Sequence, residues 1–150
     1  FAGQFHLEAL LKLGEYDAIM ESIYTYYLPM IEVGSTTVWE TFPGSTCSPD
    51  GFPTRSHCHG WSCAPLQFIS RIVLGIEQTA VGGSAFTVSP WVNGLENAQG
   101  SVATPHGPIQ VKWQRSGDVV TVNVTKPATV EICFEENRSY DGLKVEIRVA

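Results

Sequence analysis

The 150-residue sequence lacks several features that would assign it to a class directly. No apolar run approaches the ~20 residues that a bilayer-spanning helix needs, because Arg71 interrupts the best candidate, between Phe68 and Ile76. Charged residues make up only 16% of the chain, and 9 Lys and Arg face 15 Asp and Glu. The net charge of −6 argues against a nucleic-acid or anionic-membrane surface and favours uncharged partners.

Cysteine is scarce, and its spacing does not match the common metal sites. Three of the four cysteines cluster with two histidines: Cys47, His57, Cys58, His59 and Cys63. No Cys-x2-Cys or His-x3-His spacing occurs, so we expect no metal and no other cofactor. The cysteines are compatible with a loop disulfide in an oxidising compartment, as in a secreted or periplasmic protein, or with buried free thiols. A nucleophilic Cys58 activated by a flanking histidine is disfavoured, because neighbours on an extended segment point to opposite sides.

What the sequence does contain is enough apolar residues for a core. Hydrophobic residues make up 43% of it, and the length suits one ordinary domain or two small ones. No internal repeat or low-complexity tract occurs. The chain opens at Phe1 within a helical pattern, so we expect it to be a piece of a longer polypeptide.

Helical periodicity is confined to the first half of the chain. Apolar residues at helical spacing predict helices over 1–13, 16–28 and 63–76, with stops at Gly14, Pro29 and Gly75. Beyond Gly83 the period changes to two, which predicts strands at 85–88, 108–114, 119–124, 129–134 and 143–149. The fold class is therefore α+β, with an N-terminal helical segment followed by an antiparallel β-sandwich. The expected domains are 1–82 and 83–150.

Polar chemistry is concentrated between the two scaffolds, in residues 35–64. Glu40 follows Trp39 directly, and a carboxylate beside aromatic rings is suited to proton transfer; the alternative is a surface Glu in a loop. His59 and Trp61 precede a helix start at which Ser62 is the expected N-cap. A proline- and glycine-rich loop, 43–55, joins the two clusters and is expected to form a pocket rim. Its Arg55 either contacts a ligand or is a solvated loop charge.

Three motifs, T-T-V-W-E, S-H-C-H-G-W and F-T-V-S-P, together resemble the C-terminal third of the bacterial and fungal α-L-rhamnosidases of the six-hairpin glycosidase type. The resemblance implies that residues 1–82 are the last helices of an (α/α)6 barrel and that 83–150 are the β-sandwich behind it. It implies a carbohydrate substrate, Glu40 as the general base of an inverting hydrolysis that releases α-L-rhamnose or a related sugar, and His59 as a sugar contact. Cys58 stands where the family usually has Asn, which puts the identity of the sugar in doubt.

The same resemblance places the general acid upstream, in a part of the barrel outside this chain. The partner of this chain would then be the rest of that barrel, in the same polypeptide or another, and the isolated chain would be inactive. Trp39 and Trp61 are the expected walls of the sugar site, because the apolar face of a sugar packs on an indole ring.

An alternative is a non-catalytic carbohydrate-binding or structural module that acts through its β-sandwich. Such a module would present exposed aromatic rings on one sheet face, for which Trp91 and Trp113 are the candidates. Trp113 alternates in phase with Ile109 and Val111, however, which indicates a core position. Two glycosylation sequons begin at Asn123 and Asn137.

Overall fold

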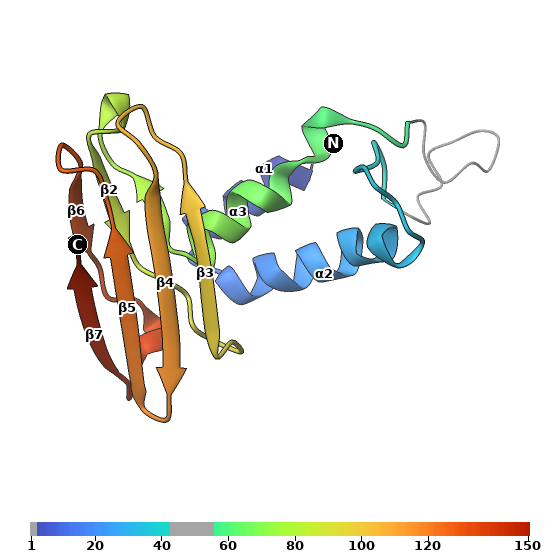
Figure 1. Cartoon of the computed structure of the whole chain (residues 1–150). Coiled ribbons are helices and arrows are strands. Elements are labelled where there is room, and N and C mark those ends of the chain that lie inside the picture. Colours follow the sequence, from blue (N-terminus) through green and yellow to red (C-terminus); the bar gives the residue numbers. More distant parts are fainter. Residues whose placement is uncertain (1–2, 43–55) are drawn as a thin grey trace. The chain divides into compact units, whose positions relative to one another are not determined.

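The computed structural model describes residues 3–42 and 56–150. The chain forms two compact units, Phe1–Phe68 and Ile69–Ala150, and each is described by itself. Helices make up the first unit and strands dominate the second (Figure 1). The α+β class is confirmed. Among the described residues, no helix is long and apolar enough to cross a membrane.

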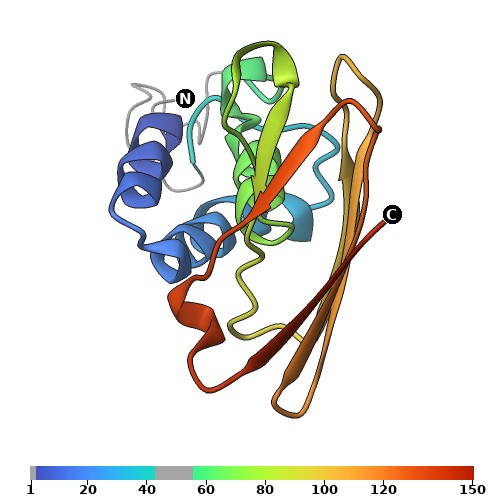
Figure 2. The ribbon, with the colours of Figure 1, turned by 90° about the vertical axis from the view of Figure 1, so that its left-hand side faces the viewer.

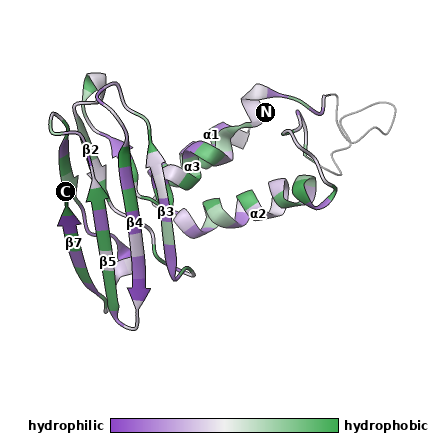
Figure 3. Ribbon diagram, viewed as in Figure 1, coloured by the Kyte–Doolittle hydropathy of each residue, from purple (hydrophilic) through white to green (hydrophobic). Residues whose placement is uncertain are grey.

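The first unit is built on a pair of helices, α1 (Gly3–Lys12) and α2 (Tyr16–Glu32), that contact each other. Leu7 of α1 and Ile19, Ile23 and Tyr27 of α2 are buried at helical spacing. Apolar bands accordingly recur along α2 (Figure 3). Gly14, with a φ of +72°, turns the chain between the helices, as the sequence predicts.

The prediction that Pro29 ends the second helix is wrong, because α2 continues to Glu32 with Pro29 inside it. Proline lacks only its own N–H, and its carbonyl still accepts from the amide of Val33 (3.3 Å). The next residue, Met30, is 2% exposed, so burial of its side chain helps to offset the missing bond. After Glu32 the chain turns at Gly34, which has a φ of +76°, and the amide of Ser35 donates to the carbonyl of Met30 (2.9 Å).

The last helical segment also differs from the prediction. A short 3-10 helix, η1 (Gly60–Ser62), precedes α3 (Ala64–Ile72), which stops four residues before the predicted end. The carbonyl of Ile72 accepts from the amide of Trp91 (2.9 Å), and Gly75 has a φ of +67°. The backbone therefore leaves the helix early, and Ile76 begins a strand instead.

The second unit consists of two sheets that pack face to face (Figure 2). One has the order β1-β2-β6 and the other β3-β4-β5-β7. The strands are β1 (Ile76–Gln78), β2 (Ala85–Val88), β3 (Asn97–Val102), β4 (Ile109–Ser116), β5 (Val119–Thr125), β6 (Glu131–Phe134) and β7 (Lys144–Val149). All five predicted strands are confirmed, and β1 and β3 are additional. The 3-10 helices η2 (Val81–Gly83) and η3 (Arg138–Tyr140) lie in the connections.

The sheets are not purely antiparallel, which corrects that part of the prediction. Strand β6 pairs parallel to β2, and β7 pairs parallel to β5. The cause is the chain path: after β5 the chain crosses to the other sheet to form β6 and then returns as β7. A strand that returns by such a crossover can arrive parallel to its neighbour, whereas a hairpin cannot.

Both tryptophans of the second unit are buried, and Trp113 belongs to the core between the sheets. Trp113 is fully buried, and its indole N–H donates to the carbonyl of Val73 (2.7 Å). Trp91 is 4% exposed, with the guanidinium of Arg138 5.5 Å from its ring centre. Trp113 is thus confirmed as a core residue, and Trp91 is not the exposed ring that the binding-module alternative requires.

Asn137 fixes the loop that follows β2. Its side-chain amide donates to the hydroxyl of Ser89 (2.8 Å) and to the carbonyl of Pro90 (3.1 Å). Its side-chain oxygen accepts from both the amide and the hydroxyl of Ser139 (2.9 and 2.6 Å). This sequon asparagine is therefore a structural residue, whereas Asn123 is exposed on β5.

Candidate functional site

The two polar clusters of residues 35–64 lie side by side in the first unit. The amide of Glu40 donates to the carbonyl of Ser56 (2.9 Å), and the amide of His59 donates to the carbonyl of Val38 (2.9 Å). The two segments run in opposite directions, since the first residue of one pairs with the last of the other. Backbone hydrogen bonds thus bring the Trp39-Glu40 segment next to the histidine segment.

Side chains hold the two segments together as well. The hydroxyl of Thr37 donates to the carbonyl of His57. The rings of Trp39 and His57 are stacked, with centres 4.7 Å apart and an interplanar angle of 28°. The indole N–H of Trp39 donates to the hydroxyl of Ser35 (2.9 Å), which fixes the ring in the plane that His57 covers. Trp39 and His57 therefore form an aromatic pair across the two segments, next to Glu40 in the sequence.

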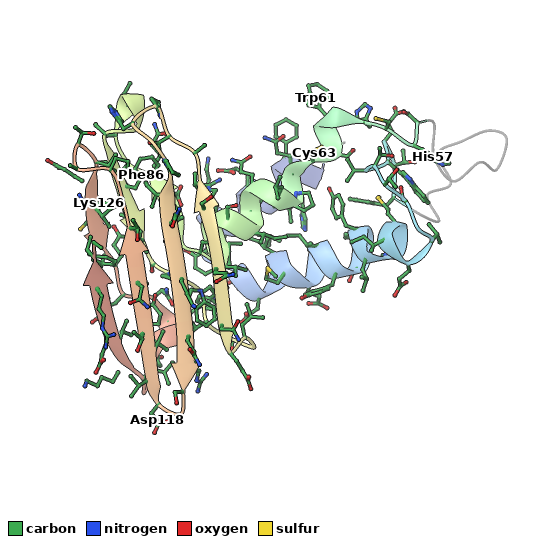
Figure 4. All side chains as sticks on the ribbon, in the orientation of Figure 1. His57, Trp61, Cys63, Phe86, Asp118 and Lys126 are labelled. Atoms are coloured by element: carbon green, nitrogen blue, oxygen red, sulfur yellow. The ribbon has the colours of Figure 1, made fainter. Side chains whose placement is uncertain are left out.

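His57 was not among the expected site residues. The sequence shows that His57 precedes His59 by two residues. This spacing does not tell which of the two imidazole rings stacks on Trp39. Glu40, Trp39 and His59 are each half-buried, and the Nε2 atom of His59 is fully buried. Trp61 is 68% exposed and projects away from η1 (Figure 4). Arg55 lies outside the described residues.

Ser62 does not cap α3, contrary to the prediction. It lies inside η1, where its amide donates to the carbonyl of His59 (2.9 Å), and it is only 3% exposed. Its hydroxyl has no hydrogen-bond partner within 3–42 and 56–150. The 3-10 turn takes the place of the expected cap because it starts the helical backbone four residues before α3.

A cavity of about 320 Å³ is lined in part by Phe42, which follows Glu40 by two residues in the sequence. It is lined by Gly3, His6, Leu7, Ser22, Tyr26, Tyr27 and Phe42. Phe42 stacks on Tyr26 with ring centres 4.4 Å apart and meets the edge of Tyr27 at 5.3 Å. Burial raises the pKa of Tyr27, with a smaller contribution from the charge of Cys63. Tyr27 thus contributes a neutral hydroxyl to a wall that also contains His6, Ser22 and Tyr26.

The described thiols lie at the surface of the protein. Cys58, Cys63 and Cys133 are free and exposed, so the expectation of buried thiols is not met for them, and Cys47 lies outside the described ranges. Within 3–42 and 56–150, no three His, Cys, Asp or Glu side chains come together in a way that could hold a metal ion.

Comparisons with known proteins point to a single group of enzymes. Residues 75–138 match the family model of the bacterial alpha-L-rhamnosidase C-terminal domain. The alpha-L-rhamnosidase of Alteromonas sp. (strain LOR) is 27% identical over 124 residues, which are 79% of this chain and 13% of that protein.

Two solved structures extend the similarity to the helical unit. The GH78 family rhamnosidase of Bacillus sp. GL1 matches with a TM-score of 0.88 and 31% identity, over 99% of this chain and 16% of that chain. The alpha-L-rhamnosidase from Dictyoglumus thermophilum has the same fold, with a TM-score of 0.72 and 23% identity, over 89% of this chain and 15% of that chain.

The resemblance that the motifs indicate is confirmed: the chain is similar to the C-terminal part of α-L-rhamnosidases, which are glycoside hydrolases. The chain spans less than a fifth of the length of each of these relatives. The similarity therefore concerns one part of a much larger catalytic protein.

Proposed function

We propose that this chain is part of an inverting glycoside hydrolase that releases terminal α-L-rhamnose, or a related sugar, and that Glu40 is its general base. The observation that supports this most strongly is the backbone pairing between the Glu40 and His59 segments. This pairing supports the proposal because it brings Glu40 and Trp39 into the segment adjacent to the one that contains the two histidines. Glu40 is the only acidic residue in the two paired segments, 35–42 and 56–63.

The chemistry requires Glu40 to be ionised and to face a water molecule. The carboxylate takes a proton from the water while the water oxygen attacks the anomeric carbon, and the bond to the leaving oxygen breaks. A second carboxyl group, about 6.5–9.5 Å away in inverting enzymes, gives its proton to that leaving oxygen. The acids of α2 and its N-cap are exposed on the helix surface, at Glu15, Asp17, Glu21 and Glu32. By the resemblance to the rhamnosidases, we assign the general acid to the rest of the catalytic barrel, outside these 150 residues.

The remaining site residues would bind the sugar. Trp39 offers an indole face that His57 and Ser35 hold in place, and such a face suits the apolar side of a sugar with a C6 methyl group. His59 and Arg55 would bind sugar hydroxyls. The exposed indole of Trp61 would close over the substrate from the helical side.

The decisive experiment is Glu40→Gln in the intact protein, with an aryl α-L-rhamnoside as substrate. Loss of a general base lowers kcat by about 10²- to 10⁴-fold. Glu32→Gln is the matched control, since Glu32 is an exposed carboxylate at the end of α2. Equal activities of the two variants would contradict the proposal. Proton NMR of the first product should show the anomer opposite to that of the substrate, and retention would exclude the inverting mechanism.

The alternative, a carbohydrate-binding or structural module, is weakened in its original form. It relied on exposed aromatic rings on the β-sandwich, and both Trp91 and Trp113 are buried.

The isolated 150-residue chain is expected to show no turnover, because it would lack the general acid. Turnover by this chain would overturn the assignment of that acid to another part of the protein.

A further inference from the structure

The outward face of the sheet β3-β4-β5-β7 is unusual in its chemistry. Along β4 and β5 the buried residues alternate with exposed ones, and the exposed ones are polar. Strand β3 exposes Asn97, Gln99 and Ser101 in the same way. Hydrophilic residues follow β4 in Figure 3, whereas β5 is largely hydrophobic. This outward surface is therefore rich in amides and hydroxyls and carries no aromatic ring.

Strand register gathers six of these side chains into two rows. Gln99 lies opposite Lys112, which lies opposite Asn123. In the adjacent row Ser101 lies opposite Gln110, which lies opposite Thr125. A groove of about 500 Å³ runs over both rows, and it is lined by Gln99, Gly100, Ser101, Gln110, Val111, Lys112, Asn123 and Thr125. Its size falls within the range of about 300–1,000 Å³ typical of small-molecule sites.

The hydrogen-bonding capacity of these six side chains is not used by the protein. Within the described chain, none of them makes a side-chain hydrogen bond or ion pair, in contrast to Asn137, whose amide makes several. An amide side chain both donates and accepts, and so does a sugar hydroxyl. The groove thus offers three amides and two hydroxyls to a ligand with many hydroxyl groups.

Charge on this face is opposite in sign to that of the chain. The outward charged residues are Lys112, Lys144, Arg148 and Glu146, three cations and one anion, which give +2 on a chain of −6. Glu146 is already engaged by Lys144 (2.6 Å) and by Arg148 (3.7 Å). Lys112 has no carboxylate partner within the described part of the chain, and the groove lining contains no acid. The charge at the groove therefore selects for an anion.

We propose that this groove binds an anionic saccharide, a short glycan segment that carries a uronic acid. Lys112 would pair with the carboxylate, while Gln99, Asn123 and Gln110 would bind the flanking hydroxyls. Single-stranded nucleic acid fits less well, because its binding depends on aromatic stacking and several cations, and the groove has no ring and one cation. The groove belongs to the second unit, and the proposal does not depend on the role proposed for Glu40.

Trigalacturonic acid and its methyl-esterified form test the proposal, because they share a shape and differ in charge. Isothermal titration calorimetry of the intact protein should detect binding of the acid. The affinity for the ester should be at least about tenfold lower than that for the acid, as expected for loss of a charged hydrogen bond. Lys112→Met should weaken binding of the acid by the same factor. Lys144→Met, on the same face but outside the groove, is the matched control and should leave the affinity unchanged. Gln99→Ala should weaken binding of both compounds.

Each of the following results would overturn the proposal. One is absence of binding of trigalacturonic acid. Another is equal affinity for the acid and the ester, which would remove the role of the charge. The third is binding of oligothymidylate with equal affinity and the same sensitivity to Lys112→Met, which would make the face a general polyanion surface. Glu40→Gln should leave binding of the acid unchanged, and a loss there would place the ligand in the catalytic site instead.

Discussion

Tyr140 is the residue whose ionisation the fold changes most clearly. Burial raises its pKa to about 12, and the hydrogen bonds of its hydroxyl with Ser89 and Asn137 act more weakly in the opposite direction. It lies in η3, beside the asparagine that fixes the loop after β2. The neutral side chain of Tyr140 therefore belongs to the same hydrogen-bond network, with Ser89 and Asn137, that holds this loop.

We expect this network to make stability depend on pH in the alkaline range. A tyrosine with a raised pKa in the folded state stabilises that state fully below the unfolded pKa, near 10, and loses this contribution as the pH rises towards about 12. Urea unfolding at pH 9 and pH 11 should show a smaller loss of stability for Tyr140→Phe than for the parent protein. Tyr24→Phe, at an exposed position on α2, is the control. A pH dependence identical in Tyr140→Phe and the parent would contradict the assignment.

The types of residue at the candidate site could be predicted from the sequence, but their pairing could not. Glu40 and His59 stand out because a carboxylate and imidazoles are concentrated between helical and strand patterns. That His57, and not His59, stacks on Trp39 depends on the backbone pairing of two segments far apart in the sequence. No local pattern encodes such a register, because it is set by long-range hydrogen bonds.

At the scale of elements, Gly75 marks the sharp turn from α3 into β1. Its φ is +67°, and a Cβ atom there would come 2.1 Å from the backbone carbon of Ser89. The amide of Ser89 donates to the carbonyl of Gly75 (2.9 Å), so the two strands must stay this close. Neither backbone can move away without breaking the β1-β2 pair.

We therefore expect Gly75→Ala to destabilise the protein by more than about 3 kcal/mol, since strain and backbone overlap add. Gly117→Ala is the matched control: its φ is +59°, but nothing lies within 4 Å of a new Cβ atom. That variant should cost only the left-handed backbone penalty of about 1–2 kcal/mol. Chemical denaturation of both variants measures the difference. Similar losses would mean that the approach of Ser89 is not rigid.

Elements with a complete hydrophobic pattern were predictable, and those that rely on tertiary contacts were not. Strands β4 and β5 alternate strongly because every second residue enters the core. The sequence of β3 does not predict a strand, because its inward residues include Gly100. The lack of a side chain at Gly100 makes room for Leu74. Pro29 gives the opposite error, because the helix continues past this local stop signal and buries Met30 in its last turn.

At the scale of the whole molecule, the two units differ in how well they cover their apolar residues. Twelve buried residues form a continuous core in the second unit. The first unit instead exposes Phe5, Leu13, Ile31 and Val33 on its helices and inter-helix segments, each by more than two thirds. Apolar area that stays in water contributes nothing to stability, so the helices of this unit should be the less stable part.

Hydrogen exchange of the 150-residue chain should reveal this difference directly. We expect amides of β4 and β5 to exchange at least about 100-fold more slowly than those of α1 and α2, because local opening of weakly packed helices needs less free energy than opening of the sandwich. In the intact protein the same helices should become protected, since further helices of the proposed barrel would cover their apolar faces. Equal protection of helices and strands in the short chain would show that the helical unit is stable on its own. Unchanged exchange of α1 and α2 in the intact protein would argue that no barrel forms around them.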